Sequence, residues 1–369
     1  MRSNKNYIPC LRWKQGEYQA LLKLPSTTKD SILPIIEVAE FSIDEPKTSF
    51  DHEDGKPSRT IDEHLSKFAK RVKEKWGINE CFVDLRHIEV TSRLVDGRHP
   101  MSLIFNDLRS QGVKAIPVVG LEQDTQYRAS AHEAILADNR GFCLRVSLQK
   151  ASSPNLVEII NNLLREMGVE TDQCDFIFDL GAPDNFEPLN IFAGILESII
   201  KNIPYLNSWR FFGLIGTSFP SSLSGIKSGI SFIPRNEWRL YKELRQNLNI
   251  SNIRIPTFGD YVISHPGISN MDMRFMKPKA NVRYALSDSW LIARGENVRD
   301  YGYGQHKELC NLILKSREYF GNSFSPADKY IYDCAKGTVP TGNLSTWRWV
   351  GTNHHLEMVT RDVANLAAS

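Results

Sequence analysis

The chain has 369 residues, of which 41% are hydrophobic, 24% charged and 10% aromatic, a globular mixture that argues against a largely disordered or coiled-coil protein. Its 45 basic and 43 acidic residues leave a net charge of +2, which provides no overall field to hold DNA or an anionic membrane. No apolar run reaches the length of a membrane span, and the first residues lack the apolar core of a secretory signal, so we expect a cytoplasmic protein without membrane contact.

Short apolar runs that read as β-strands alternate with longer amphipathic stretches along the first 265 residues. Several of the runs are almost continuously apolar, as expected for strands covered on both faces in a parallel sheet. The eight predicted strands are residues 7–13, 32–40, 81–88, 114–121, 141–148, 175–181, 210–218 and 253–261.

Helical patterns separate these strands. Residues 61–77 place Leu65, Phe68 and Val72 on one face, and Gly77 suits the end of that helix. Further helices are predicted over residues 99–112, 127–141, 153–168, 190–203 and 235–247. The alternation predicts an α/β protein with a (β/α)8 TIM-barrel-like fold over residues 1–265.

Two alternatives to this barrel stay open. If residues 7–13 lie outside it, residues 281–288 could supply the eighth strand. A doubly wound open sheet is the other alternative, although no early strand is followed by a GxGxxG loop.

The rhythm changes after residue 265. Residues 281–297 predict a β-hairpin, 306–321 a helix, and the last helix is expected to begin near His354. We expect residues 266–369 to form a hairpin-plus-helices extension that packs on the barrel without folding independently. The polar segment 41–60 is expected to be a long loop.

The six cysteines are expected to be buried, reduced thiols. They lie at positions 10, 81, 143, 174, 310 and 334, and no CxxC pair is present. A structural zinc site is therefore not expected.

Acidic side chains stand where predicted strands end, and the loops after barrel strands converge on one face. Glu37, Asp84 and Asp179 are the candidate ligands for Mg²⁺ or Mn²⁺, and the same three carboxylates, with His265, are candidate catalytic groups. The alternative is that these acidic groups cap helices and pair with Arg or Lys. Asp179 should share a strand face with Ile177, so an inward Asp179 requires a partner.

Four further strand-end residues are candidates for ligand binding: Lys14, Arg145, Thr217 and Asp260. Arg145 lies in the fifth strand, where its guanidinium could clamp a phosphate. Pairing with the neighbouring carboxylates is the competing interpretation.

Residues 342–359 combine aromatic, basic and imidazole side chains. Trp347, Arg348, His354 and His355 are candidates for stacking on bases or closing a pocket as a lid. Adjacent histidines project in different directions, so they do not form a metal pair by themselves. Alternatively, the tryptophans anchor this segment to the barrel, and Thr352 or Asn353 caps the last helix.

Several stretches resemble the Beta protein family: YIPCLRWKQGEYQAL with LPIIEV near the start, TSFP at 217–220, FGDYVISHP at 258–266, ANVRYALSDSWLIARG at 280–295 and WRWVGTNHHL at 347–356. The family takes its name from the Beta protein of a satellite-phage gop–beta–cII gene cluster. The resemblance implies a component of an antiviral, toxin–antitoxin-like module of prophages and satellite phages, in which Beta restrains a toxic Gop partner. It carries over no catalytic residue.

Three functions follow. The first is a regulatory or sensing protein that binds products of neighbouring defence genes (a Gop-like toxic protein and a regulator) or a phage-derived trigger. The second is a metal-dependent phosphodiesterase or nuclease built on Glu37, Asp84 and Asp179. The third, weaker hypothesis is direct nucleic-acid binding by the Trp/Arg/His segment, which the near-zero net charge disfavours.

Overall fold

The computed structural model describes residues 5–41, 60–267 and 278–368. The loop predicted over residues 41–60 lies outside these ranges except at its two ends. None of the helices in these ranges combines the length and the hydrophobicity that a membrane span requires.

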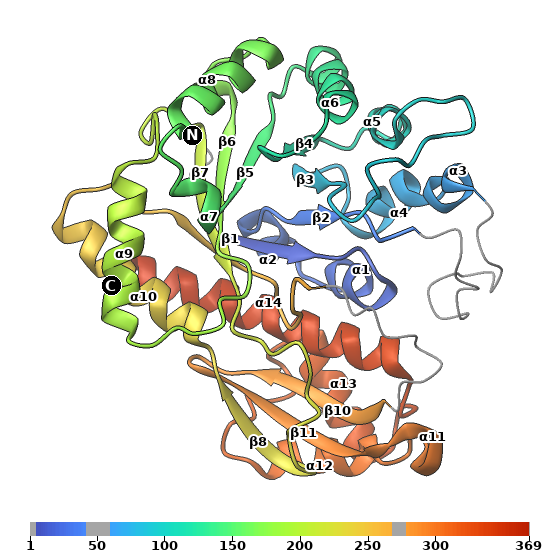
Figure 1. Ribbon diagram of the computed structural model, residues 1–369. Coiled ribbons are helices and arrows are strands. Elements are labelled where there is room, and N and C mark those ends of the chain that lie inside the picture. Colours follow the sequence, from blue (N-terminus) through green and yellow to red (C-terminus); the bar gives the residue numbers. More distant parts are fainter. Residues whose placement is uncertain (1–4, 42–59, 268–277, 369) are drawn as a thin grey trace.

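Eight parallel strands close into a barrel, as the alternation of strands and helices predicts (Figure 1). The last barrel strand, β9, pairs with both β7 and β1, so the sheet has no open edge. The eight strands are β1 (Tyr7–Leu11), β2 (Ile35–Glu37), β3 (Cys81–Asp84), β4 (Ala115–Val119), β5 (Cys143–Ser147), β6 (Asp175–Asp179), β7 (Phe211–Gly216) and β9 (Thr257–Asp260). All eight predicted strand positions are confirmed, and the open-sheet alternative is wrong.

Helices cover the outside of this barrel. Their bounds are α1 (Gln15–Leu22), α2 (Ser26–Ser31), α3 (Ile61–Leu65), α4 (Phe68–Lys75), α5 (Pro100–Ser110), α6 (Thr125–Asp138), α7 (Leu148–Ala151), α8 (Leu156–Met167), α9 (Leu189–Lys201) and α10 (Asn236–Ile250), with a short 3₁₀ turn at Thr171–Gln173. The outer core between helices and strands includes Phe176 and Phe178 of β6, whereas Ile177 lies in the inner core with Ile8 and Ile35. The strand alternation predicted for residues 175–181 is thus confirmed.

The interior of the barrel is tightly packed where β7, β9 and β1 meet, and Gly259 of β9 has no space for a side chain. A Cβ placed on Gly259 would lie 2.6 Å from the backbone oxygen of Ile8 and 2.5 Å from Cγ2 of Ile215. Both distances are shorter than any van der Waals contact. The strands must therefore part to accept a side chain at this position.

We accordingly expect Gly259→Ala to lower the free energy of unfolding by about 1–3 kcal/mol, because overpacking strains the strands. Gly194→Ala is the matched control: Gly194 lies within α9, and a Cβ there meets nothing within 4 Å. This control should raise stability by up to ~1 kcal/mol, since alanine favours helix. Urea unfolding measures both changes. Equal effects of the two substitutions would contradict the packing argument.

The C-terminal part forms a three-stranded antiparallel sheet and four helices. The predicted hairpin is present as β10 (Lys279–Ala285) and β11 (Ser289–Asn297), so residues 281–288 do not supply a barrel strand. The third strand, β8 (Gly229–Pro234), was not predicted from the sequence. It lies between β7 and α10 in the chain and pairs with β11. The helices are α11 (Val298–Tyr301), α12 (His306–Lys315), α13 (Pro326–Lys336) and α14 (Leu344–Ala368).

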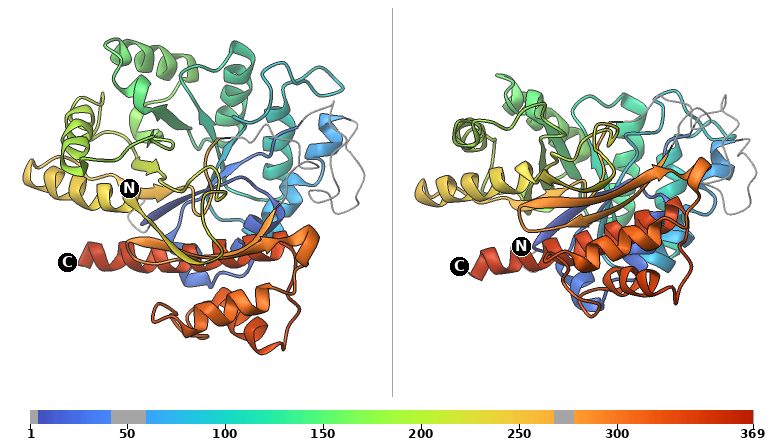
Figure 2. Two further views of the ribbon diagram at one scale, coloured as in Figure 1. Left: turned by 60° about the horizontal axis from the view of Figure 1, so that its bottom comes forward. Right: turned by 90° about the horizontal axis from the view of Figure 1, so that it is seen from below.

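Helix α14 joins the two parts of the molecule. It runs between the barrel and the sheet of β8, β10 and β11 (Figures 1 and 2). Its first half packs on the core of the extension through Trp347 and Val350, and its second half packs on the barrel core through Leu356 and Val359. Together with β8, it links the two sides of the boundary expected at residue 265.

Helix α14 begins ten residues before the predicted start at His354. Residues 347–355 are therefore helical, and neither Thr352 nor Asn353 caps the helix. Both side chains are fully buried, and Asn353 instead bonds to Ala327 and to the carbonyl of Ala20. All six cysteines are free and buried, as expected.

Candidate functional site

The guanidinium of Arg145 lies at the centre of the barrel mouth. Strand alternation on β5 turns Leu144 and Val146 toward the helices and leaves Arg145 facing inward. Its Nη1 donates to Glu37 at 2.9 Å and to Asp84 at 2.7 Å, and its Nε donates to Asp179 at 2.9 Å. The three predicted carboxylates therefore do converge, and they converge on an arginine.

Neighbouring side chains complete this cluster, which we call the Arg145 network. Nη2 of Arg145 donates to the hydroxyl of Tyr261 at 2.7 Å, and that hydroxyl lies 2.8 Å from both oxygens of Asp179. Strand β3 ends at Asp84, and the following turn brings Nε2 of His87 to 2.8 Å from Glu37. Arg86 adds a bond of 3.2 Å to Asp179.

Glu37 and Arg145, at the centre of the Arg145 network, are buried and charged. Burial by itself would raise the pKa of Glu37, but Arg145 and His87 hold this pKa far below its usual value. Burial likewise opposes the charge on Arg145, yet the surrounding Tyr261, Asp179, Cys10 and Glu37 groups keep its pKa well above normal. At neutral pH Glu37 and Arg145 therefore form a charged, buried salt bridge.

This geometry corrects two expectations. The position that Mg²⁺ or Mn²⁺ would need between Glu37, Asp84 and Asp179 is filled by a guanidinium, and no cluster of His, Cys, Asp or Glu suited to a metal occurs in the described part of the chain. Arg145 also has its donors engaged within the protein, so it is not placed to clamp a phosphate. The competing interpretation, ion pairing, is what the structure contains.

A second buried cluster, centred on Asp260, lies where β9 meets α14. The carboxylate accepts from Tyr7 Oη at 2.5 Å and lies 2.8 Å from Nε2 of His355. Arg235 approaches it at 3.8 Å and pairs with Glu237 at 3.3 Å. Asp260 and His355 are fully buried, so neither is open to a ligand. Thr217 is also fully buried, where its hydroxyl accepts from the amide of Phe219.

The remaining aromatic and imidazole candidates are structural anchors. His354 lies 2.8 Å from Asp328 and 2.8 Å from the carbonyl of Ala285, and it is fully buried. Trp347 is 5% exposed, and its ring stacks on His306 at 4.6 Å. These side chains are thus not exposed for stacking on bases, and Trp347 packs in the core of the extension, whereas the anchoring alternative expects it on the barrel.

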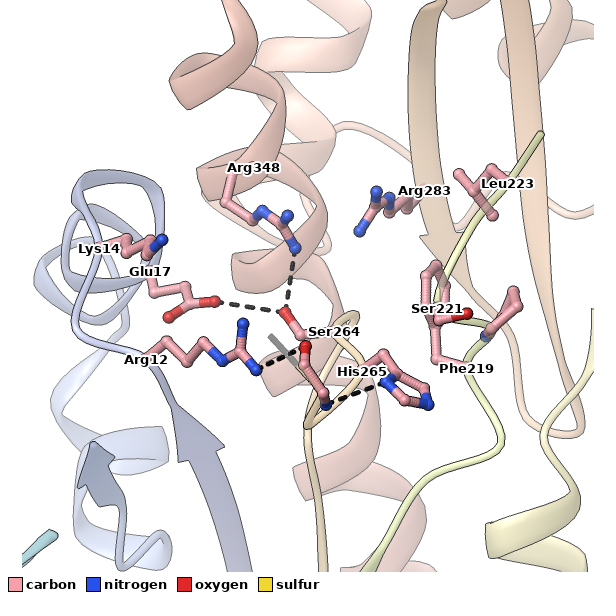
Figure 3. A pocket seen from close by; sticks show the side chains of 12 residues that line it. Arg12, Lys14, Glu17, Phe219, Ser221, Leu223, Ser264, His265, Arg283 and Arg348 are labelled. Atoms are coloured by element: carbon pink, nitrogen blue, oxygen red, sulfur yellow. Dashed lines mark hydrogen bonds between the residues drawn. The ribbon is translucent and has the colours of Figure 1, made fainter. Parts of the chain in front are cut away.

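One pocket brings the remaining candidates together at the barrel mouth (Figure 3). It has a volume of about 220 Å³ and lies between the ends of β1, β7 and β9 on one side and β10 with α14 on the other. We call it the basic pocket. Its lining residues are Arg12, Lys14, Glu17, Phe219, Pro220, Ser221, Leu223, Ser264, His265, Gly267, Arg283 and Arg348.

Backbone geometry brings the basic groups into this pocket. Gly16 allows α1 to pack closely on α14, since a Cβ there would overlap the side-chain stem of Arg348. Arg348 then donates to Ser264 at 3.0 Å, and Arg283 donates to the carbonyl of Ile263 at 2.6 Å. Arg12 donates to the carbonyls of Pro266 and Gly267. Each guanidinium is thus held in place by neutral acceptors.

His265 and Lys14 belong to this pocket and not to the Arg145 network. Nδ1 of His265 accepts from the amide of Gly267 at 3.0 Å, and burial together with Arg12 lowers its pKa. The expected partnership of His265 with Glu37, Asp84 and Asp179 is therefore wrong. Lys14 pairs with Glu40 at 2.7 Å.

Three residues of these sites were not predicted from the sequence: Arg12 and Arg283 of the basic pocket, and Tyr261 of the Arg145 network. Arg12 stands one residue beyond β1, where strand-end reasoning could have found it. Arg283 lies on a strand of the extension, and no local pattern connects that strand to a barrel mouth. Tyr261 directly follows β9, in the FGDY run.

Comparison with known protein families identifies a match over most of the chain. The family model described as Beta protein matches residues 7–361, which is nearly the whole chain and includes both the barrel and the extension. No curated protein matches the chain.

Proposed function

Because the chain belongs to the Beta protein family, we propose that it is the regulatory component of an antiviral defence module carried by a phage or prophage. In this role it restrains a toxic partner, a Gop-like product of a neighbouring gene, and responds to a phage-derived trigger or a regulator encoded beside it. The barrel mouth is the proposed binding surface.

The observation that carries this proposal is the composition of the basic pocket. Barrel loops supply Arg12 and His265, whereas the extension supplies Arg283 and Arg348. A ligand or partner group bound there contacts both parts of the molecule at once. Binding can therefore change how the extension sits on the barrel, which is what a sensing protein requires.

The Arg145 network supports a binding protein more than a metal-dependent phosphodiesterase. Such an enzyme needs carboxylate oxygens directed at a metal ion that activates water. In this chain Glu37 and Asp84 both direct an oxygen at Nη1 of Arg145. A metal ion would have to displace a guanidinium from a buried site, at a large electrostatic cost.

Toxicity suppression tests the proposal. The neighbouring genes are expressed from an inducible promoter with and without this chain, and colony formation is counted. We expect colony counts to fall by at least 100-fold when the chain is omitted, and to recover when it is supplied from a second plasmid. An affinity-tagged chain should also co-purify with the toxic product. Toxicity that is the same with and without the chain would overturn the proposal.

A further inference from the structure

We propose that the basic pocket binds the phosphate group of a small phosphorylated molecule. The inference rests on the proposed function only in taking this pocket as the sensing site. It concerns the chemistry of the ligand, and it can be tested on the isolated protein.

The first argument is the charge of the lining. Among the described residues that line the pocket, Arg12, Lys14, Arg283 and Arg348 are cationic and Glu17 is the one carboxylate. Lys14 is already neutralised by Glu40. In the described part of the chain, no ion pair joins Arg12, Arg283 or Arg348 to a carboxylate. Three guanidinium charges therefore meet at one cavity with no carboxylate of the described residues within salt-bridge distance.

The second argument is the cost of this arrangement. Burial lowers the pKa of Arg283 well below its usual value, and the positive charge of Arg348 lowers it further. Burial and the charge of Arg12 also lower the pKa of Arg348, and the nearby Glu17 raises the pKa of both arginines without cancelling these decreases. Placing cations side by side in a desolvated site is unfavourable unless an anion compensates them. A bound anion would supply that compensation.

The third argument is how firmly the guanidiniums are held. Backbone carbonyls and Ser264 accept one edge of each group, and Arg283 also lies 4.9 Å above the ring of Phe219. For Arg283 and Arg348, no bond from Nη2 is found to any described residue, so these donors are available to a ligand. Fixed donors bind an anion with little loss of side-chain entropy.

The shape of the site favours phosphate over carboxylate. The three arginines come from three directions, from the end of β1, from β10 and from α14 (Figure 3). A tetrahedral phosphate presents oxygens in several directions, whereas a carboxylate presents two oxygens in one plane. The volume of about 220 Å³ is below the usual range for drug-sized ligands, so the site suits a phosphate monoester with a small organic part.

A substitution of Glu17 should change the anion affinity of the pocket in the opposite direction to the arginine substitutions. One of its oxygens accepts from Ser264 at 3.3 Å, and the other is buried without a partner in the described part of the chain. Burial raises the pKa of Glu17. A charged Glu17 opposes anion binding, so a neutral amide at this position should improve it.

Isothermal titration calorimetry of the full chain with inorganic phosphate, glycerol 3-phosphate and malonate tests the inference. We expect both phosphates to bind at least 10-fold more tightly than malonate. R283Q and R348Q should each weaken phosphate binding at least 10-fold, and E17Q should tighten it. R128Q is the matched control, because Arg128 pairs with Glu166 on the outer helices. It should leave the affinity unchanged.

Equal affinity for malonate and phosphate, or an unchanged affinity in both R283Q and R348Q, would overturn the inference. Using two arginine variants guards against one of them failing to fold, which a melting curve reveals.

The toxicity assay separates this result from the proposed function. If the variants lose phosphate binding but still suppress the toxic partner, the anion site stands and its regulatory role fails. If they lose suppression but still bind phosphate, the inference fails and the proposed function stands.

Discussion

Replacing Arg145 with Met should lower the free energy of unfolding by about 3–5 kcal/mol, the largest loss that we expect from a single substitution in this chain. The reason is that three carboxylates share its guanidinium at 2.7–2.9 Å in a buried site. Arg86 reaches Asp179 and His87 reaches Glu37, but no described side chain takes over the position of Nη1 between Glu37 and Asp84. Urea unfolding followed by circular dichroism measures the loss.

The loss should depend on pH with a definite sign. Arg145 holds the pKa of Glu37 far below its usual value. In the variant, burial acts on Glu37 without the opposing charge of Arg145, so the folded-state pKa of Glu37 rises. A group with a raised folded pKa loses its stabilising contribution as the pH rises through that pKa. The deficit of the variant should therefore be smaller at pH 5 than at pH 8.

Arg128→Met is the control for the Arg145 variant, because it removes an arginine from a partly exposed pair with Glu166. Such pairs contribute at most about 1 kcal/mol. Equal losses in the two variants, or a deficit for Arg145→Met that does not change with pH, would show that the carboxylates do not depend on this arginine.

Arg235→Met is the second substitution with a large expected effect, again about 3–5 kcal/mol. Arg235 is fully buried, pairs with Glu237, and donates to the carbonyls of Leu286 and Ser287 in the turn between β10 and β11. It therefore links α10 of the barrel to the extension. Its removal leaves Asp260 and Glu237 buried beside a histidine whose pKa is lowered by burial.

The region that becomes less stable distinguishes this prediction from a general loss of stability. Hydrogen exchange should become faster in α14 and β10, which pack against this region, before it changes in β3 and β4 on the other side of the barrel. Lys242→Met is the matched control on the same helix, since Lys242 pairs with Asp288 at the surface. Uniformly faster exchange, or an equal effect of the control, would contradict a linking role for Arg235.

Local patterns in the sequence predicted the barrel because its strands are short, apolar and separated by amphipathic helices. They failed at α14 and β8, where contacts distant in sequence decide the structure. Gly351, Thr352 and Asn353 favour loops in isolation. In the folded chain, Gly351 lies where α14 crosses the extension, and a Cβ on it would come within 3.0 Å of the carbonyl oxygen of Arg283. Strand β8 depends on pairing with β11, about 60 residues later.

The candidate site shows the same division between local and distant information. The positions of Glu37, Asp84 and Asp179 at strand ends correctly predicted that they lie close together, because parallel strands end at one face of a barrel. The group that lies between these carboxylates could not be predicted locally, because it is the guanidinium of Arg145, which is 108 residues from Glu37. The basic pocket depends on Arg283 and Arg348, and their position follows from the packing of the whole extension.

The central claim is that this chain works through its basic pocket and not through its carboxylates. The toxicity-suppression assay with two variants tests it most directly. Asp84→Asn removes a charge that metal-dependent catalysis would need, and R283Q/R348Q removes the cations of the pocket. With both variants present at wild-type levels, we expect Asp84→Asn to suppress the toxic partner normally and R283Q/R348Q to lose suppression. Loss of suppression in Asp84→Asn together with normal suppression by R283Q/R348Q would contradict the claim.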